Sequence, residues 1–384
     1  MKERIHLLME DLQTLRKEID EIDNSLVALF EKRMAIAEQV AAYKIQIGKP
    51  VFDKDREQEK LSSLGSMAHN EFNRCGIQQL YEQIMSISRK RQYQLLQKHN
   101  PVQDWGFTPI ESLGTEGVTV VYQGVEGAYS HAAVQAFFGN QVSSFHVDTW
   151  KHAMEAIQKG EAHYAVLPIE NSTAGIVQDN YDLLAAYNHV IVGEQLIPCK
   201  HVLLGLPKTE LSQIEQVYSH PQALMQCADF LDSHSNWHVH EYANTAMAAK
   251  KVAEEQNPSQ AAIASPYAAK VFNLEILAEN IYSNPGNSTR FIIVSRDKVY
   301  CKHAKKVSVS FELPHTSGSL YNSLSHIIYN GLNMTSIESR PVLDKNWEYR
   351  FFVEFEGNLM ESAVKNALCG LDAEVQNLRI HGNY

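Results

Sequence analysis

The feature that most restricts how this chain can fold is a heptad pattern near its N-terminus. Leucine and isoleucine recur in alternating steps of four and three, at Leu8, Leu12, Leu15, Ile19, Ile22, Leu26 and Leu29. This spacing is typical of the a/d seam of a coiled coil, and no glycine or proline interrupts residues 3–47. The pattern predicts a helix of about 40 residues, on the order of 60 Å long. Because such a helix cannot bury its seam alone, we expect a partner helix or a second chain to cover it.

Two basic residues lie further along the same helix. Arg33 falls in the register where a leucine is expected, and Lys44, three helical turns later, shares its face. Cations on an apolar seam are costly unless an anion binds them. The pattern therefore predicts an anionic ligand, with the alternative that these side chains reach solvent or pair with buried glutamates.

Two shorter helices are expected after the turn Gly48-Lys49-Pro50. Asp53 has the properties of an N-cap, with Arg56 and Glu57 one turn later in a short helix. A loop near residues 65–73 is expected before a third helix over residues 76–98. Ser88 and Gln92 lie one turn apart on the flank of that third helix.

Residues 1–96 resemble the all-helical chorismate mutases. The positions that match the active site of that family are Arg16, Arg33, Lys44, Asp53, Arg56, Glu57, Ser88 and Gln92. The resemblance implies that arginines bind the two carboxylates of chorismate, while Lys44 and Gln92 donate hydrogen bonds to its ether oxygen. It also implies that Glu57 binds the substrate hydroxyl and that Arg16 reaches across a dimer interface into the partner's site. The chain departs from the family over residues 58–75, where the expected helix is shorter.

From residue 118 the pattern changes to strands that alternate with helices, after a linker with proline and glycine over residues 97–117. Several strands end in polar residues that open the next helix, among them Glu170-Asn171, Ser219-His220 and Asn244-Thr245. A polar turn over residues 283–290 also runs directly into an apolar strand. Such units predict a mostly parallel sheet with helix N-termini that converge on an anion. For any one of them, plain helix capping is the alternative.

Residues 118–297 resemble the prephenate dehydratases. The matching motifs are Gly127-Ala128-Tyr129-Ser130, Pro168-Ile169-Glu170-Asn171, Tyr218-Ser219-His220-Pro221, Asn244-Thr245-Ala246 and Thr289-Arg290-Phe291. The resemblance implies two α/β lobes of the periplasmic-binding-protein kind, with the site in the cleft between them. Val125 stands where proline is usual in this family, and Asn244 stands where serine is frequent.

The same resemblance implies roles for individual residues. Thr289 is the implied proton donor as prephenate loses carbon dioxide and its ring hydroxyl to give phenylpyruvate. The residues implied to bind the substrate are Glu170, Asn171, Ser219, Gln226, Asn244 and Thr245. Arg290 would anchor the loop or a carboxylate. Because a threonine hydroxyl is a weak acid, a second group is expected behind Thr289, and Glu170 and His220 are the candidates.

Residues 305–384 show a third pattern. Strands and helices follow in the order βαββαβ, which predicts an α+β ferredoxin-like sandwich. The segment resembles the ACT regulatory domain, whose phenylalanine-binding motifs match Gly318-Ser319-Leu320 and Glu338-Ser339-Arg340-Pro341. Ser319 replaces the usual alanine. The resemblance implies L-phenylalanine as an effector, and a purely structural dimerisation domain is the alternative.

Composition excludes several other classes of protein. The formal net charge of −11 argues against a nucleic-acid binder, and no apolar run approaches the roughly 18 residues that a membrane helix needs. Five scattered cysteines without a CxxC motif argue against a disulfide framework or a zinc site, so a reducing cytoplasm is expected. We expect no metal and no cofactor.

Three segments in this order resemble the bifunctional chorismate mutase–prephenate dehydratases over nearly the whole chain. The resemblance implies a multi-domain enzyme of phenylalanine biosynthesis, inhibited by phenylalanine and assembled as a homodimer, with further pairing left open. The rival hypothesis is a non-catalytic bilobal solute-binding or sensory protein fused to a coiled coil and an ACT domain. The rival would bind prephenate without turnover and would not need cations on the helical seam.

Overall fold

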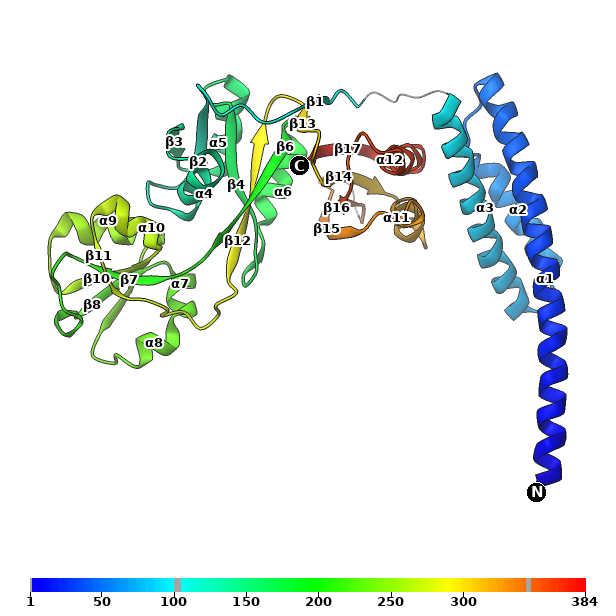
Figure 1. Cartoon of the computed structure of the whole chain (residues 1–384), viewed down its shortest axis with the longest axis horizontal. Coiled ribbons are helices and arrows are strands. Elements are labelled where there is room, and N and C mark those ends of the chain that lie inside the picture. The colour runs from blue at the N-terminus through cyan, green and yellow to red at the C-terminus, as the bar shows by residue number, and fades with distance from the viewer. Residues whose placement is uncertain (1, 100–104, 343–346) are drawn as a thin grey trace.

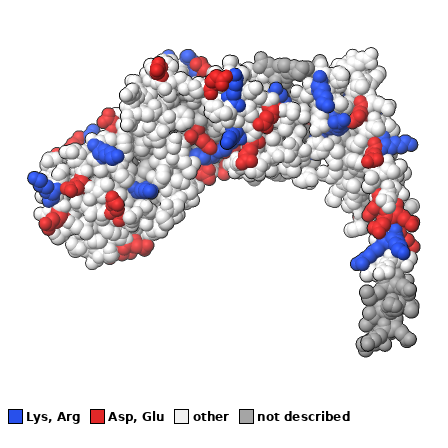
Figure 2. Space-filling model, viewed as in Figure 1, with Lys and Arg blue, Asp and Glu red and all other residues white. Residues whose placement is uncertain are grey.

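The computed structural model describes residues 2–99, 105–342 and 347–384 and shows an elongated molecule (Figure 1). Three helices lie at one end, two α/β lobes lie at the other, and a small α/β unit lies between them. On the face shown in Figure 2, basic side chains are interspersed with acidic ones and do not merge into an extended basic patch. Within the described ranges, none of the helices combines the length and the apolar character that crossing a membrane would require.

The N-terminal unit consists of α1 (Lys2–Ile47), α2 (Lys54–Ser66) and α3 (Glu71–His99). The single long helix predicted from the heptads is confirmed. The third helix starts earlier than predicted, so that only a few residues separate it from α2. Asp53 caps α2, because its carboxylate accepts a hydrogen bond from the backbone N–H of Arg56 at 3.3 Å.

The a/d seam of α1 is not covered by its own chain in the described residues. The helix packs on α3, and its buried residues Ala37 and Ala41 lie off the seam. The apolar seam residues from Leu12 to Val40 are exposed, with Ile22 60% and Leu29 64% accessible. Leu8 lies where only the backbone of the helix is described.

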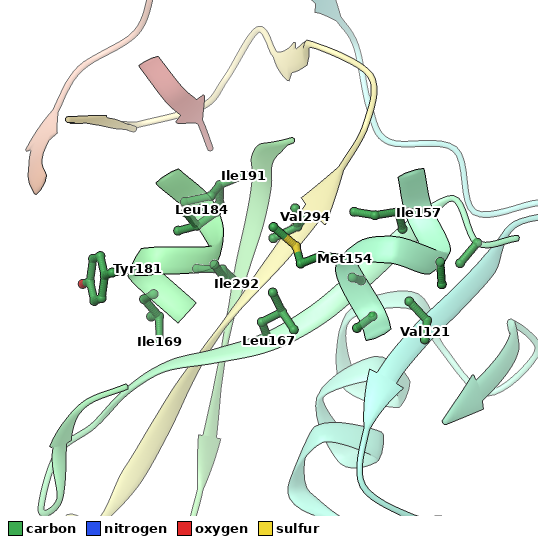
Figure 3. Close-up of a cluster of buried hydrophobic side chains, with 14 of the residues drawn as sticks. Val121, Met154, Ile157, Leu167, Ile169, Tyr181, Leu184, Ile191, Ile292 and Val294 are labelled. Atoms are coloured by element: carbon green, nitrogen blue, oxygen red, sulfur yellow. The ribbon is translucent and has the colours of Figure 1, made fainter. Parts of the chain in front are cut away.

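The first α/β lobe is built on a sheet with the strand order β6-β12-β4-β2-β3. Its strands are β2 (Thr119–Gln123), β3 (Ser143–Val147), β4 (Tyr164–Asn171), β6 (Val190–Pro198) and β12 (Ser288–Ser295), with a short β5 (Gly175–Ile176) beside β4. Its helices are α4 (Tyr129–Phe138), α5 (Trp150–Lys159) and α6 (Gln178–Ala186). Apolar side chains from β4, β12, α5 and α6 form the core on one face of this sheet (Figure 3).

The second lobe has a separate sheet with the order β11-β7-β10-β8-β9. Its strands are β7 (Val202–Gly205), β8 (Gln216–Ser219), β9 (His238–Glu241), β10 (Gln260–Ala264) and β11 (Glu275–Ala278). Its helices are α7 (Pro221–Gln226), α8 (Ala228–Asp232), α9 (Thr245–Glu255) and α10 (Pro266–Phe272), with a short 3-10 turn at Leu211–Gln213. Two chain crossings, from β6 to β7 and from β11 to β12, join the lobes.

The prediction of mostly parallel sheets is wrong for both lobes. Strands β2, β3 and β4 are parallel, but β12 runs antiparallel to both of its neighbours, β4 and β6. In the second lobe β7 runs antiparallel to β10 and β11. The reason is the double crossing, because a chain that leaves the first lobe on β6 and returns on β12 must traverse the sheet in the opposite sense.

The small central unit has the predicted βαββαβ order. It comprises β14 (Lys306–Leu313), α11 (Ser319–Tyr329), β15 (Met334–Pro341), β16 (Tyr349–Glu356), α12 (Ser362–Glu374) and β17 (Gln376–Asn383). The strands pair antiparallel in the order β15-β16-β14-β17. The helices α11 and α12 pack against α3 of the N-terminal unit.

The central unit and the first lobe share one continuous sheet, which the sequence pattern does not indicate. Strand β17 pairs with β6 in parallel, with Gly382 opposite Ile191. A Cβ on Gly382 would lie 2.0 Å from the carbonyl oxygen of Ile191, so only glycine permits this approach. The linker expected over residues 97–117 also contains a strand, β1 (Thr108–Ile110), which pairs with β13 (Val299–Cys301).

Candidate active sites

A cavity of about 190 Å³ lies between the two lobes. The first lobe contributes Asn171 from the end of β4 and Thr289 from the start of β12, and the second contributes residues at the N-termini of α7 and α9. The side chains that line the cavity are Tyr129, Asn171, Cys199, His201, His220, Gln222, Ala223, Gln226, Asn244, Thr245, Asn287 and Thr289. Asn171, Gln226, Asn244, Thr245 and Thr289, which the sequence singles out, therefore meet in one place.

Thr289 is held by two neighbours at the wall of this cavity. The Asn171 Nδ2 donates a hydrogen bond to Thr289 Oγ1 at 2.9 Å, and the Cys199 Sγ lies 3.1 Å from the same oxygen. The orientation of the Asn171 amide is fixed, because its Oδ1 accepts hydrogen bonds from the backbone N–H groups of Thr173 and Ala174. Burial raises the pKa of the Cys199 thiol, so this group stays protonated.

A chain of polar side chains extends from Asn171 to the far side of the cavity. Asn171 also donates to Asn287 Oδ1 at 3.0 Å, and Asn287 Nδ2 donates to Gln226 Oε1 at 2.9 Å. The His201 Nε2 lies 2.9 Å from Gln226 Oε1, which can only accept, so the proton of His201 is on Nε2. His201 Nδ1 then accepts from the Tyr129 hydroxyl at 3.0 Å. Burial lowers the pKa of His201, which favours this neutral imidazole.

Several predicted site residues lie outside the cavity. Ser219 is fully buried, and its hydroxyl donates to the carbonyl oxygen of Ile263 at 2.6 Å. Glu170 and Arg290 are paired neighbours of Asn171 and Thr289 on β4 and β12, so their side chains point to the opposite face of the sheet. They form an ion pair there, with Arg290 Nη2 3.4 Å from Glu170 Oε2.

The suggestion that Glu170 stands behind Thr289 is therefore wrong. His220 does line the cavity, but its Nδ1 accepts from the backbone N–H of Gln222, as a helix cap does. Asn244 likewise caps α9 through the N–H of Met247 at 2.7 Å while it faces the cavity.

The sequence motifs did not assign site roles to five residues that line the cavity: Tyr129, Cys199, His201, Gln222 and Asn287. Tyr129 and Asn287 stand inside the motifs used above, whereas Cys199 and His201 carry no sequence signal.

The second candidate site lies on the three N-terminal helices. Burial lowers the pKa of both Arg33 and Lys44, while the nearby carboxylate of Glu57 acts in the opposite sense on each. The Lys44 Nζ donates to the carbonyl oxygen of Val51 at 2.5 Å. Ser88 and Gln92 are buried on the adjoining face of α3. Glu57 thus lies near both cations, and its carboxylate forms an ion pair with Arg89 of α3, which also pairs with Glu374 of α12.

Two polar atoms in this region are buried without a hydrogen-bond partner among the described residues, Arg33 Nη1 and Gln92 Oε1. An unpaired buried polar group costs about 1–3 kcal/mol, which favours a polar ligand here. Arg56 is exposed on α2, next to the cap residue Asp53, whose carboxylate lies 3.3 Å from Lys49 Nζ.

Arg16 is not brought to this group by its own chain. Arg16 is exposed on α1. It precedes Arg33 by seventeen residues, so the two residues are about 25 Å apart along the helix axis. Arg16 can therefore take part in such a site only from a second copy of the chain.

The two motifs predicted to bind an effector lie at one end of the central sheet. Gly318, with φ +78°, precedes α11, and the Ser319 hydroxyl donates to the carbonyl oxygens of Pro314 and Thr316. Leu313 at the end of β14 and Pro341 at the end of β15 both pair with Tyr349 of the strand between them. Two strand spacings place these ends about 10 Å apart. Leu320 packs into the core of the unit, whereas Arg340 forms an ion pair with Asp182 of α6.

Family models match two parts of the chain: chorismate mutase type II over residues 15–93 and prephenate dehydratase over residues 120–299. A bifunctional chorismate mutase/prephenate dehydratase from Enterobacter agglomerans is 31% identical over 386 residues, which cover 97% of this chain and 95% of the relative. The chain belongs to the bifunctional chorismate mutase/prephenate dehydratase family. It therefore has both activities, an isomerase and a lyase of phenylalanine biosynthesis, and the rival hypothesis of a non-catalytic solute-binding protein is not favoured.

Two solved structures each resemble about 70% of this chain. A prephenate dehydratase from Arthrobacter aurescens in complex with L-Phe has a TM-score of 0.64 and 33% identity, and covers 70% of this chain and 89% of its own. A protein described as GqqA, a novel type of quorum quenching acylase, has the same TM-score with 29% identity, and covers 69% of this chain and 96% of its own.

Proposed function

We propose that the cavity between the lobes is the dehydratase site and that Thr289 delivers the proton that lets the ring hydroxyl of prephenate leave as water. The carbon–carbon bond to the carboxylate breaks, carbon dioxide leaves, and its electron pair completes the aromatic ring as the carbon–oxygen bond breaks. The observation that carries this proposal is the placement of Thr289 Oγ1, which accepts a hydrogen bond from Asn171 at the cavity wall.

The neighbours of Thr289 supply the assistance that a weak acid needs. As the hydroxyl proton moves to the leaving oxygen, negative charge develops on Oγ1. The Asn171 N–H and the Cys199 S–H are both placed to donate to that oxygen. Because Asn171 is locked by two backbone N–H groups, it needs no reorganisation during the reaction.

Substrate binding in this cavity relies on neutral donors and a helix terminus. Gln226 Oε1 accepts from both His201 and Asn287, an arrangement in which Nε2 would be the atom that donates to the substrate. Thr245 is the first residue of the eleven-residue helix α9, where the helix dipole stabilises a carboxylate. Asn244 lies beside it as the cap.

For the mutase reaction we propose a site completed by a second copy of the chain. In this proposal one chain supplies Arg33, Lys44, Glu57, Ser88 and Gln92, and a second copy supplies Arg16 across the a/d seam of α1. The exposed seam supports this arrangement, since a row of exposed leucines and isoleucines would be buried in a dimer. The reaction needs only a substrate held in a folded conformation and an ether oxygen stabilised as charge builds.

For the central unit we propose an ACT regulatory domain that binds L-phenylalanine through the residues at the sheet end described above. The Arthrobacter aurescens relative, whose structure holds L-Phe, supports this assignment. The ends of β14 and β15 bring the motifs at residues 318–320 and 338–341 to the same edge.

Thr289→Ala is the direct test of the dehydratase assignment. Dehydratase turnover on supplied prephenate should fall by about 10²–10⁴-fold, as expected for loss of a general acid, while chorismate consumption stays at the wild-type rate. Phenylpyruvate and prephenate are followed in the same preparation. If the variant kept wild-type rates of both prephenate dehydration and chorismate consumption, Thr289 would have only a structural role in the turn.

A further inference from the structure

The strand that carries Thr289 is bound to the central unit through its next residue, Arg290. Because successive strand residues point to opposite faces, the Arg290 side chain points away from the cavity and is buried on the opposite face of the continuous sheet. There its Nη1 lies 2.9 and 3.1 Å from the two carboxylate oxygens of Glu354, a buried residue of β16. Charge-assisted hydrogen bonds of this kind are the strongest in proteins.

Glu354 is itself fixed by a third residue. The hydroxyl of Tyr384 donates to Glu354 Oε1 at 2.9 Å. Burial raises the pKa of Tyr384 well above its ordinary value, so the hydroxyl remains a donor. The Glu354 carboxylate therefore lies between the guanidinium of Arg290 from the first lobe and the buried hydroxyl of Tyr384.

Two further carboxylates compete for the same guanidinium. Glu194 of β6 lies 3.3 Å from Arg290 Nη1, and Glu170 of β4 lies 3.4 Å from Nη2. Both are more exposed than Glu354, and Glu194 is already paired with Lys306 at 2.7 Å. Without the charge on Glu354, the guanidinium would shift toward these two residues and toward solvent.

Such a shift would act on Thr289 through the ladder between β12 and β4, whereas β12 pairs with β6 in unbroken register from Ser288 to Ile293. The register of β12 against β4 is irregular between Arg290 and Phe291. A bulge of this kind redirects the side chains next to it. The anchor on Arg290 therefore helps to decide where the Thr289 hydroxyl points.

The predicted effector motif lies against the same part of the dehydratase. Arg340 Nε donates to Asp182 of α6 at 3.0 Å, and the preceding residue, Tyr181, packs on Phe352 with ring centroids 5.0 Å apart. Phe352 is two residues before Glu354 on β16. A contiguous set of contacts thus joins the motif, α6 and Glu354.

We propose that Glu354 is a positioning residue of the dehydratase reaction, supplied by the regulatory domain, and that it acts by holding Arg290 and so the neighbouring Thr289. The inference rests on the proposed role of Thr289. It makes the central unit a structural part of the dehydratase site and not only an attached sensor.

The test compares Glu354→Gln with wild type in the full chain, on supplied prephenate. The substitution keeps the shape of the side chain and removes its charge. We expect kcat to fall by about 10–100-fold, the loss typical of a misplaced catalytic group, with KM within about threefold of wild type. Mutase turnover should not change. Glu354→Asp, which keeps the charge, should recover part of kcat.

Glu356→Gln is the matched control, because Glu356 is exposed on the same strand and should leave kcat unchanged. Wild-type kcat in Glu354→Gln would overturn the proposal, and so would a lower melting temperature with unchanged kcat at a permissive temperature. If Glu354→Gln does not fold, Tyr384→Phe, which removes one hydroxyl, should lower kcat several-fold, and wild-type kcat there would also overturn it. A Thr289→Ala variant that keeps dehydratase turnover refutes the role of Thr289 instead, so the two failures are distinguishable.

Discussion

The two candidate sites of this enzyme are built in different ways. The dehydratase cavity is lined by residues of a single chain. Hydrogen bonds connect its polar side chains in the order Tyr129, His201, Gln226, Asn287, Asn171 and Thr289. The proposed mutase residues lie on helices whose apolar seam is exposed. Among the described residues, polar atoms of Arg33 and Gln92 have no hydrogen-bond partner, and Arg16 lies far along α1. From this difference we expect the dehydratase activity to depend on the tertiary structure of one chain and the mutase activity to depend on the assembly of two chains.

Among the substitutions that test this comparison, Arg33→Ala is expected to have the largest effect, a loss of mutase activity. Loss of a cation that binds a substrate carboxylate should lower mutase kcat/KM by about 10²–10³-fold, the size seen for single donors in preorganised sites. Dehydratase turnover on prephenate should be unchanged, because the two sites share no residue. Arg91→Ala is the control, since Arg91 is a partly exposed residue of α3 paired with Glu38. Equal mutase rates in the two variants would remove Arg33 from the site.

A seam substitution tests the dependence on assembly. Ile22→Asp places a charge on the exposed seam and should weaken dimerisation by about 100-fold, because the charge would be buried in the interface. Mutase activity should then decline on dilution while dehydratase activity does not. Asn24→Asp introduces the same side chain on the opposite face of α1 and should leave the dimer intact. Sedimentation and both rates are measured at matched concentrations, and a concentration-independent mutase rate in Ile22→Asp would break the comparison.

The junction between the domains can be tested separately from either site. Gly382→Ala forces a Cβ against the carbonyl oxygen of Ile191 and should destabilise the continuous sheet by about 1–3 kcal/mol, the usual cost of overpacking. Gly114→Ala, where a Cβ meets open space, is the control. Thermal unfolding measures the difference, and equal melting temperatures would mean that β17 and β6 are not tightly joined in solution.

The smallest effect is expected for Cys199→Ala. The thiol is one of two groups next to Thr289 Oγ1, and Asn171 remains in place without it. Dehydratase kcat should fall by less than about tenfold, because a thiol is a weak donor. Asn171→Ala, measured beside it, should lose considerably more. If Cys199→Ala lost more kcat than Asn171→Ala, the Cys199 thiol and not the Asn171 amide would be the main group that assists Thr289.

Local sequence patterns predicted most of the elements correctly. The heptads of α1, the βαββαβ order of the central unit and the polar motifs at 168–171 and 289–291 needed no knowledge of distant residues. The family comparisons confirm the two activities that these motifs imply. Hydrophobic periodicity and helix or strand ends are properties of neighbouring residues, so the sequence shows them directly.

What the sequence determined about this protein is therefore the type of each element and the chemistry carried by each motif. The tertiary structure decided which side chains meet. Glu170 stands one residue from Asn171 in sequence, yet the alternation of the strand sends it to the opposite face, where it pairs with Arg290. Cys199 reaches Thr289 from ninety residues away, and Glu354 reaches Arg290 from another domain. Contacts of this kind depend on strand pairing and on the crossing of the chain between lobes, which no local pattern encodes.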